Sequence, residues 1–302
     1  MGIRQYLREI GRGKDGARAL TRAQAADLFG QVLDGAVSDL AVGSFCMAMR
    51  CKGETCDELA GFLDALHERM ARVDARGLPV VVLPSYNGSR RLPLLTPLLA
   101  LLLARRGLPV LVHGTPTEDS RLPLTDLLAP LGIETLAQAR APAPAEAVFV
   151  PTEVLHPGLK RLLDVRRTTG LRNPAHSVVK LMNPCAGPAV VVGSYTHPEY
   201  ARSMGEVFER MGCTAMLLRG TEGEPVADAR RQPRMEGFVR GQRSVLHEGE
   251  RGTLPEVAGW PADNEAAATV RYIRQVLDGA QPVPPAIALQ VDHLVRLAGA
   301  AA

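Results

Sequence analysis

The chain has 302 residues, 46% of them hydrophobic and 22% charged, so it is long and apolar enough to bury a full core in one large domain or two smaller ones. The formal net charge of +3 excludes a strongly basic chain, and any signal for nucleic acid must come from local clustering. The longest apolar stretch, residues 94–104, is too short to span a bilayer, and charges interrupt the first ten residues where a signal peptide needs an apolar core, so we expect a cytoplasmic protein without membrane contact.

The first seventy residues predict helices. Thr21 with Gln24 forms one capping box, and Thr55 with Glu58 forms another. Apolar residues follow each box at helical spacing. Asp39 is expected to cap the helix between them. Because no strand pattern appears in this region, the chain is expected to begin with a small helical domain.

The cysteines predict neither a metal site nor a disulfide framework. Their number is odd, and no two of them form a CxxC pair. They are Cys46, Cys51, Cys56, Cys185 and Cys213. The first three are five residues apart, and this spacing places successive side chains on different faces of a helix. Reduced, mostly buried thiols are the better interpretation, and we expect no metal and no other cofactor.

After the helical start, strand-like runs alternate with helical stretches, which is typical of a parallel sheet covered by helices. The strands are expected at 78–83, 108–112, 146–150, 188–193 and 213–218. Residues 156–182 interrupt the alternation with a long basic helical stretch, and residues 219–260 predict loops with one short strand. Two amphipathic helices are expected within 262–297, the first capped by Asp263. The fold class is therefore α/β, with a small N-terminal helical domain and a larger α/β domain whose sheet is mainly parallel.

The turn after the first expected strand lies where an α/β protein usually places a phosphate-binding loop. Its residues are Pro84, Ser85, Tyr86, Asn87 and Gly88. Only one glycine is present, no acidic residue follows it, and two arginines come next. The position suits a phosphate site, whereas the composition does not suit catalysis.

Three side chains at this turn have two interpretations each. Arg90 and Arg91 are expected to open a helix and contact phosphate, or to pair with nearby carboxylates. Tyr86 either stacks on a base or hydrogen-bonds its own turn. Aromatic residues make up only 4% of the chain, so affinity for nucleic acid would come mainly from phosphate contacts, with weak base discrimination.

Residues 160–180 concentrate positive charge. The basic side chains of this segment are Lys160, Arg161, Arg166, Arg167, Arg172 and Lys180. One acid, Asp164, opposes them, so the segment carries +5 in a chain whose total is +3. Arg172, His176 and Lys180 follow at intervals of four and would share one helix face, with Pro174 in the first turn. The cluster predicts a phosphate-binding ridge, and the alternative is an ordinary solvated helix face.

The helical start resembles the anthranilate phosphoribosyltransferase family. Residues 20–29, 34–40 and 48–55 carry the likeness, and Lys52-Gly53-Glu54-Thr55 is its most specific element. The likeness continues to about residue 225. It implies a fold like that of these enzymes and of class III nucleoside phosphorylases, usually dimeric through the helical part. The helical domain would comprise residues 1–75 with 156–186, and the α/β domain residues 76–155 with 187–302.

The resemblance fails at the catalytic motifs. The family's Gly-Thr-Gly-Gly-Asp loop, which holds phosphoribosyl pyrophosphate, corresponds to residues 84–88, and its Lys-His-Gly-Asn-Arg motif to residues 112–116, where only His113 and Gly114 match. The Asp-Glu pair that binds magnesium falls on Pro225 and Val226, which offer no carboxylate. We therefore expect no catalytic and no metal-binding residue, and a vestigial phosphate loop made of Ser85, Tyr86, Asn87, Gly88, His113 and Gly114.

Further blocks resemble the YbiB-like branch of this family. They are residues 84–90, 95–100, 112–114, 172–177, 197–200 and 220–224. This resemblance implies a homodimer that binds nucleic acid without evident sequence preference and without catalysis, and single strands are the favoured ligand. The residues expected to bind it are Lys160, Arg161, Arg166, Arg167, Arg172, His176, Lys180, Arg90 and Arg91. Two alternatives remain open: a phosphoribosyl transferase with a divergent loop, and a regulatory protein that binds a nucleotide in the old pocket.

Overall fold

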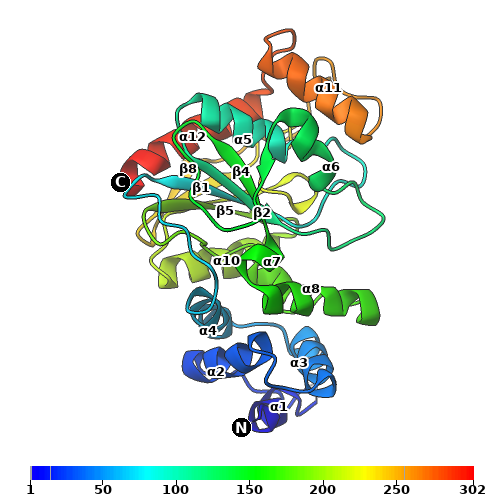
Figure 1. Ribbon diagram of the computed structural model, residues 1–302, viewed down its shortest axis with the longest axis vertical. Helices are drawn as coiled ribbons and strands as arrows, with labels where there is room; N and C mark the ends of the chain where they lie inside the picture. The colour runs from blue at the N-terminus through cyan, green and yellow to red at the C-terminus, as the bar shows by residue number, and fades with distance from the viewer. Residues whose placement is uncertain (1, 14, 255) are drawn as a thin grey trace.

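The computed structural model describes residues 2–13, 15–254 and 256–302, and it consists of two parts stacked along its longest axis (Figure 1). A helical bundle with the N-terminus forms one part, and a sheet covered by helices forms the other. The N-terminal helices are α1 (Arg4–Ile10), α2 (Arg22–Leu33), α3 (Asp39–Lys52) and α4 (Cys56–His67). The predicted helical start is confirmed.

Local side-chain chemistry sets where these helices begin. Both predicted capping boxes, at Thr21 and Thr55, are present. The prediction that Asp39 caps α3 is wrong by one residue, because Ser38 is the N-cap and accepts a hydrogen bond from the backbone N–H of Ala41 at 3.3 Å. Asp39 is instead the first helical residue, where a negative charge favours the helix dipole.

The second part contains an eight-stranded sheet in the order β3-β4-β2-β1-β5-β6-β7-β8. Strands β1 to β6 pair in parallel, and β7 and β8 extend the sheet antiparallel. The strands are β1 (Val80–Ser85), β2 (Val110–Gly114), β3 (Glu134–Thr135), β4 (Ala147–Pro151), β5 (Ala189–Tyr195), β6 (Ala215–Arg219), β7 (Met235–Val239) and β8 (Gln242–His247). The expected mainly parallel sheet is confirmed.

The five predicted strands exist, but they begin one or two residues later than expected. For β1 the reason is a turn, because the N–H of Leu78 bonds to the carbonyl of Ala75 and delays the strand to Val80. The strand then continues through Pro84 and Ser85. Only the residues from Tyr86 onward therefore form the loop.

Residues 219–260 contain a hairpin, β7–β8, instead of loops with one short strand. Its two-residue turn is Arg240 and Gly241, both at positive φ, as a type I′ turn requires. Strand β8 is an exposed edge strand whose residues are mostly polar. Because its sequence lacks an apolar alternation, the strand pattern does not show in it.

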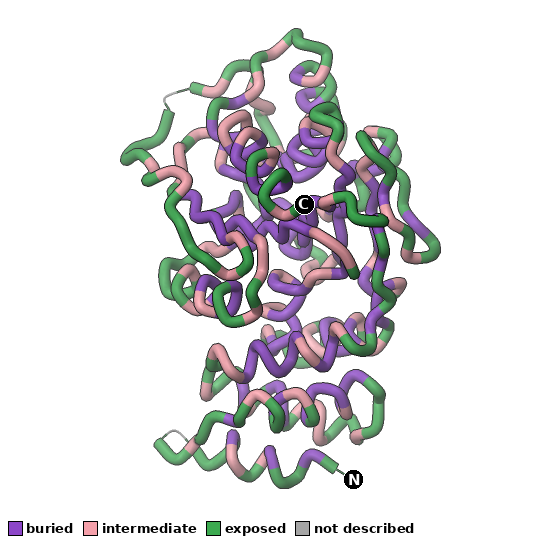
Figure 2. The backbone as a smooth tube through the Cα atoms, turned by 90° about the vertical axis from the view of Figure 1, so that its left-hand side faces the viewer, coloured by how far each residue is buried: buried purple, intermediate pink, exposed green. Residues whose placement is uncertain are grey.

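Helices cover both faces of the sheet, and the sheet separates two apolar clusters. Val80 and Val82 of β1 join one cluster, and Val81 and Leu83 join the other, as alternation along a strand dictates. The first cluster runs without interruption from the helical bundle to the sheet, and the buried trace passes through both parts in Figure 2. The remaining α-helices are α5 (Thr96–Arg105), α6 (Thr125–Leu128), α7 (Thr152–Leu155), α8 (Pro157–Thr169), α9 (Ala175–Val178), α10 (Pro198–Arg210), α11 (Ala266–Leu277) and α12 (Pro285–Ala301).

Helices α11 and α12 confirm the two amphipathic helices expected near the C-terminus. The expected cap of the first is wrong, because Glu265 is the N-cap and Asp263 only accepts a bond from its backbone N–H at 3.1 Å. Among the helices of the described residues, none combines the length and apolarity needed to cross a bilayer.

Candidate functional site

The carboxyl ends of β1, β2 and β4 bring the candidate loop residues to one edge of the sheet. Tyr86 follows β1, His113 and Gly114 end β2, and Thr152 follows β4. Gly114 is required by this arrangement, since a Cβ there would lie 1.9 Å from the carbonyl oxygen of Ser85. In doubly wound sheets this edge is where ligands bind.

A glutamate of the same chain fills the loop. Glu224 is only 1% exposed, and its Oε1 accepts hydrogen bonds from the backbone N–H groups of Asn87 at 2.8 Å and Gly88 at 2.9 Å. Its Oε2 accepts from the hydroxyl of Thr96 at 3.0 Å and from that of Ser85. Backbone amides and hydroxyls of this kind are the donors that phosphate uses. The carboxylate therefore stands where an anion would bind.

A second glutamate covers the outer end of the loop. The backbone N–H of Arg90 donates to Glu222 Oε2 at 2.6 Å, and that of Arg91 lies 3.2 and 3.3 Å from the two carboxylate oxygens. The expectation that these arginines open a helix is wrong, because α5 begins only at Thr96. Their side chains are exposed, and no carboxylate of the described residues pairs with them.

The turn that carries both glutamates fits closely against the loop. Glu222 and Gly223 adopt positive φ, and a Cβ on Gly223 would lie 1.9 Å from Asn87 Nδ2. Lys180 Nζ and Ser194 Oγ both donate to the carbonyl oxygen of Gly223, at 2.9 and 2.8 Å. Burial lowers the pKa of Lys180 to about 8, although the charge of Glu224 opposes that shift.

The interior beneath the loop holds Tyr86 and His113. The hydroxyl of Tyr86 is 2.8 Å from His113 Nδ1 and accepts a hydrogen bond from Thr152 Oγ1 at 3.1 Å. Burial lowers the pKa of His113 to about 3 and raises that of Tyr86. Tyr86 therefore lies in the core, away from any surface on which a base could stack, and His113 is neutral.

Residues 172–180 do not form the expected helical ridge. Helix α9 ends at Val178, so Lys180 lies in the turn beyond it and is buried against Gly223. Burial, together with the charges of Arg172 and Arg166, lowers the pKa of His176 to about 3. His176 therefore adds no positive charge at neutral pH, and only Arg172 of the three expected ridge residues presents its charge at the surface.

Three arginines gather around one carboxylate at the rim of the loop. Glu118 accepts from Arg121 Nε at 3.1 Å, Arg166 Nη2 at 2.8 Å and Arg172 Nη2 at 3.2 Å, and we call these three arginines the arginine rim. Burial disfavours the charged form of Glu118, but the hydrogen bond from Arg166 and the charge of Arg121 outweigh it, and the pKa of Glu118 is lowered. Three positive charges against one negative charge leave the rim with a net excess of two.

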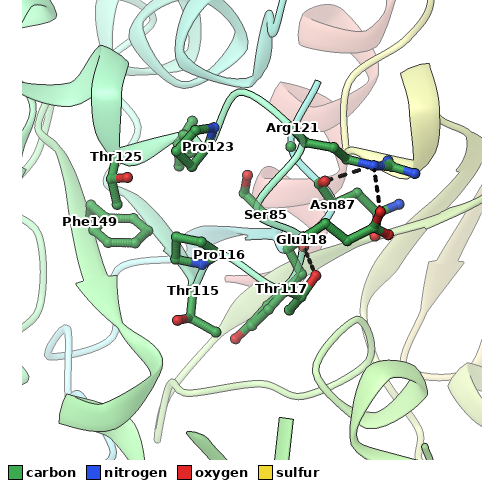
Figure 3. Close-up of a pocket in the computed structure, with 13 residues that line it drawn as sticks. Ser85, Asn87, Thr115, Pro116, Thr117, Glu118, Arg121, Pro123, Thr125 and Phe149 are labelled. Carbon is green, nitrogen blue, oxygen red and sulfur yellow. Dashed lines mark hydrogen bonds and ion pairs between the residues drawn. The ribbon is translucent and has the colours of Figure 1, made fainter. Parts of the chain in front are cut away.

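The rim joins the loop through Arg121. Figure 3 shows Arg121 directed toward Asn87 and Glu118, and its Nη1 is 3.5 Å from the carbonyl oxygen of Asn87. The hollow beside them, between residues 85–88 and 115–125, offers about 10 Å³. That volume holds about one water molecule and is far too small for a sugar pyrophosphate.

The remaining basic residues of the predicted cluster have other partners. Arg167 pairs with Asp119 at 2.6 Å, Lys160 pairs with Asp164, and Arg161 Nη2 donates to the carbonyl oxygen of Val32 in the helical bundle at 3.1 Å. The fold therefore brings Arg166, Arg167 and Arg172 to the loop and turns Lys160 and Arg161 away from it. Sequence reasoning missed Glu118 and Arg121, whose segment shows no basic cluster.

The residues present do not fit a magnesium ion. Val226 is buried in the apolar core, and the carbonyl oxygen of Pro225 accepts from Gln290 Nε2 at 2.9 Å. The neighbouring carboxylates, Glu222 and Glu224, are bound to the loop. Within the part of the chain that the structure describes, no three His, Cys, Asp or Glu side chains gather as metal ligands.

Sequence comparisons place related proteins along the whole chain. The helical bundle domain of a glycosyl transferase family matches residues 4–70. The chain is 36% identical to the uncharacterized protein YbiB of Escherichia coli (strain K12), over 100% of this chain and 96% of that protein. It is 30% identical to the anthranilate phosphoribosyltransferase of Methylobacterium nodulans, over 99% of this chain and 90% of that enzyme.

Solved structures share the fold. The anthranilate phosphoribosyltransferase of Thermus thermophilus superimposes with a TM-score of 0.73 at 24% identity, over 98% of this chain and 87% of that one. The Saccharomyces cerevisiae enzyme in complex with phosphoribosyl pyrophosphate and magnesium gives 0.70 at 13% identity, over 98% and 88%. The architecture of a helical N-terminal domain and an α/β domain is that of these structures.

Proposed function

Because the chain belongs to the anthranilate phosphoribosyltransferase-like family and fills its own phosphate loop, we propose that it binds nucleic acid through the phosphate backbone and does not catalyse phosphoribosyl transfer. The arginine rim is the observation that carries this proposal. Its two excess positive charges lie at the ligand-binding edge of the sheet. Guanidinium groups bind phosphate oxygens in a fork, so the rim suits a phosphodiester.

The basic residues form a track and not a single point. Arg167 lies at one end beside Asp119, the rim follows, and Arg121 reaches Asn87. Beyond Asn87, the exposed side chains of Arg90 and Arg91 add positive charge to the same loop. A flexible single strand can follow such a track with successive phosphates, and phosphate contacts carry little sequence information.

The same proposal includes a cytoplasmic homodimer that pairs through α3. Leu40 and Met47 are 83% and 52% exposed, although both are large and apolar. They are seven residues apart, which puts them on one face of the helix. A second copy of the chain would cover this face and place two arginine rims on one particle, which raises avidity for a long strand. Leu40→Asp should shift the molecular mass measured by light scattering from dimer to monomer.

The test is fluorescence anisotropy of labelled single-stranded oligonucleotides, titrated across a salt series. We expect an affinity that falls with a slope of about −0.7 per contacted phosphate and that differs little between unrelated sequences. Replacing Arg121 and Arg172 together by alanine should weaken binding of every sequence and reduce the slope by about 1.4. Arg202→Ala, which removes a side chain 84% exposed on helix α10 that pairs with Glu206 and not with the rim, is the matched control and should change little.

Two results would overturn this function. One is the lack of binding at low salt, and the other is an unchanged affinity in the double variant. A transferase activity is the second candidate, because the chain is 30% identical to the M. nodulans enzyme over 99% of its length. It predicts magnesium-dependent consumption of phosphoribosyl pyrophosphate with anthranilate, and we expect none because Glu224 occupies the loop.

A further inference from the structure

Six donors in and beside the loop that follows β1 meet carboxylates of the same chain. Glu224 takes two backbone amides and two hydroxyls. Glu222 takes the backbone amides of Arg90 and Arg91. Six donors from residues 85–96 thus converge on two carboxylates from residues 222 and 224, although about 130 residues of chain separate the two segments.

We propose that residues 85–91, together with Thr96, form an oxyanion receptor that the chain keeps occupied with its own Glu224 carboxylate, and with that of Glu222 at the outer end. The ligand that the receptor would otherwise take is a small oxyanion such as inorganic phosphate, or a carboxylate such as acetate. This inference does not rest on nucleic-acid binding, because the arginine rim lies outside the receptor.

The inner carboxylate is held far more firmly than the outer one. Glu224 is 1% exposed and accepts from four donors, and its negative charge favours the protonated form of nearby Lys180. Glu222 is half-buried, accepts only from two amides, and sits at φ 53°, a strained value for a residue other than glycine. Glu224 is therefore the permanent occupant, whereas Glu222 closes the entrance.

The occupant explains how the fold can persist without its ligand. Two amides and two hydroxyls would be left unpartnered in the interior without an anion, and unpartnered buried donors are costly. The Glu224 carboxylate satisfies them while covalently tethered, so no free phosphate competes at an ordinary concentration. The loop thus retains the shape of a phosphate site but remains closed to phosphate.

The test removes the occupant and supplies a free one. Glu224→Ala should lower the melting temperature, and inorganic phosphate or acetate should restore it in a saturable manner. A roughly tenfold excess over the Kd should raise the Tm by about 3 °C relative to chloride at equal ionic strength. The wild-type protein should respond to phosphate and chloride alike.

Two control variants isolate the receptor. Glu224→Gln keeps the side-chain volume, so it should be destabilised yet gain nothing from phosphate, because no space opens. Gln290→Ala removes another buried polar side chain, one that accepts from a single backbone N–H, that of Ala227, and phosphate should not rescue it because one amide does not make an oxyanion site. Equal rescue of all three variants, or no rescue of Glu224→Ala, would overturn the proposal.

If Glu224→Ala does not fold, Glu222→Ala decides the matter. Without the outer carboxylate the amides of Arg90 and Arg91 lose their partner, so phosphate should slow hydrogen exchange in a peptide that covers residues 85–92. The wild-type peptide should show no such protection. Exchange that phosphate leaves unchanged in Glu222→Ala would refute an oxyanion receptor, and it would leave the nucleic-acid proposal standing.

Discussion

The phosphate loop and the arginine rim lie side by side, yet their charges are balanced in opposite ways. In the loop, two carboxylates accept hydrogen bonds from uncharged amides and hydroxyls, so each of these donors already meets a negative charge. In the rim, three guanidinium groups share one carboxylate, and positive charge is left over. Both sites carry donors that suit anions, but only the rim has more positive charges than carboxylates to balance them.

The difference lies in where the counter-charges come from and how deeply they are buried. Glu224 is buried, whereas the rim arginines are partly exposed. Their partner Glu118 lies in the loop after β2. A buried carboxylate with four donors is fixed, while a partly exposed ion pair is worth little and can be exchanged. Three experiments test this difference between the loop and the rim.

The largest effect should come from pushing the glutamate turn out of the loop. A Cβ on Gly220 would lie 1.8 Å from the carbonyl oxygen of Glu224, so Gly220→Ala must displace the turn. We expect the free energy of unfolding to fall by about 1–3 kcal/mol, measured by denaturant titration. Gly187→Ala, where no heavy atom lies within 4 Å of the added Cβ, is the control and should be nearly neutral. Equal stability of the two variants would mean that the turn is not locked.

A smaller effect should come from removing the one negative charge of the rim. Glu118→Gln leaves Arg121, Arg166 and Arg172 without their shared counter-charge. Affinity for single-stranded oligonucleotides should rise by about two- to fivefold at fixed salt, while thermal stability falls. Fluorescence anisotropy and thermal unfolding, measured on the same preparation, test the predicted rise in affinity and the predicted fall in stability. An affinity that falls would show that Glu118 orients the arginines for the ligand and does not merely compete with it.

The smallest effect should come from Lys180, which lies between the two sites. Its pKa is lowered from an ordinary 10.5 to about 8, so the unfolded chain holds this proton more firmly between those values. In that window the Lys180 contribution makes stability rise with pH. Oligonucleotide affinity should fall about twofold as pH rises through 8, because one positive charge beside the rim is lost. Lys180→Met should flatten both profiles, and a profile unchanged by this substitution would exclude Lys180 as their source.

The local features of the fold could be predicted from the sequence. The capping boxes at Thr21 and Thr55 depend on residues three positions apart, and the parallel strands show as apolar runs between helical stretches. The β7–β8 hairpin could not be recognised, because its edge strand is polar and exposed. The position of the loop at the end of β1 was predictable for the same local reasons, and so was its lack of glycines.

The chemistry of the site depended on contacts between distant segments, which a single sequence does not reveal. The residues around 86 give no sign that Glu224 occupies the loop. The residues around 166 likewise do not indicate that Arg166 pairs with Glu118. Counting charges along residues 160–180 overstated the free positive charge, because the fold supplies acids from elsewhere. Burial then removed His176 from the count by lowering its pKa to about 3.

Helix α8 has a mechanical consequence. The helix lies between the helical bundle and the sheet (Figure 1). Its Arg161 donates to the carbonyl oxygen of Val32 in the helical bundle, while its Arg166 pairs with Glu118 on the sheet side. The helix thus links the two parts of the molecule, and a change in the angle between these parts would change the spacing between Arg166 and the arginines of the sheet side. Under the proposed function, a strand that bridges Arg121 and Arg166 would fix that angle, and by reciprocity the proposed pairing of two copies through α3 would change how tightly the strand is held.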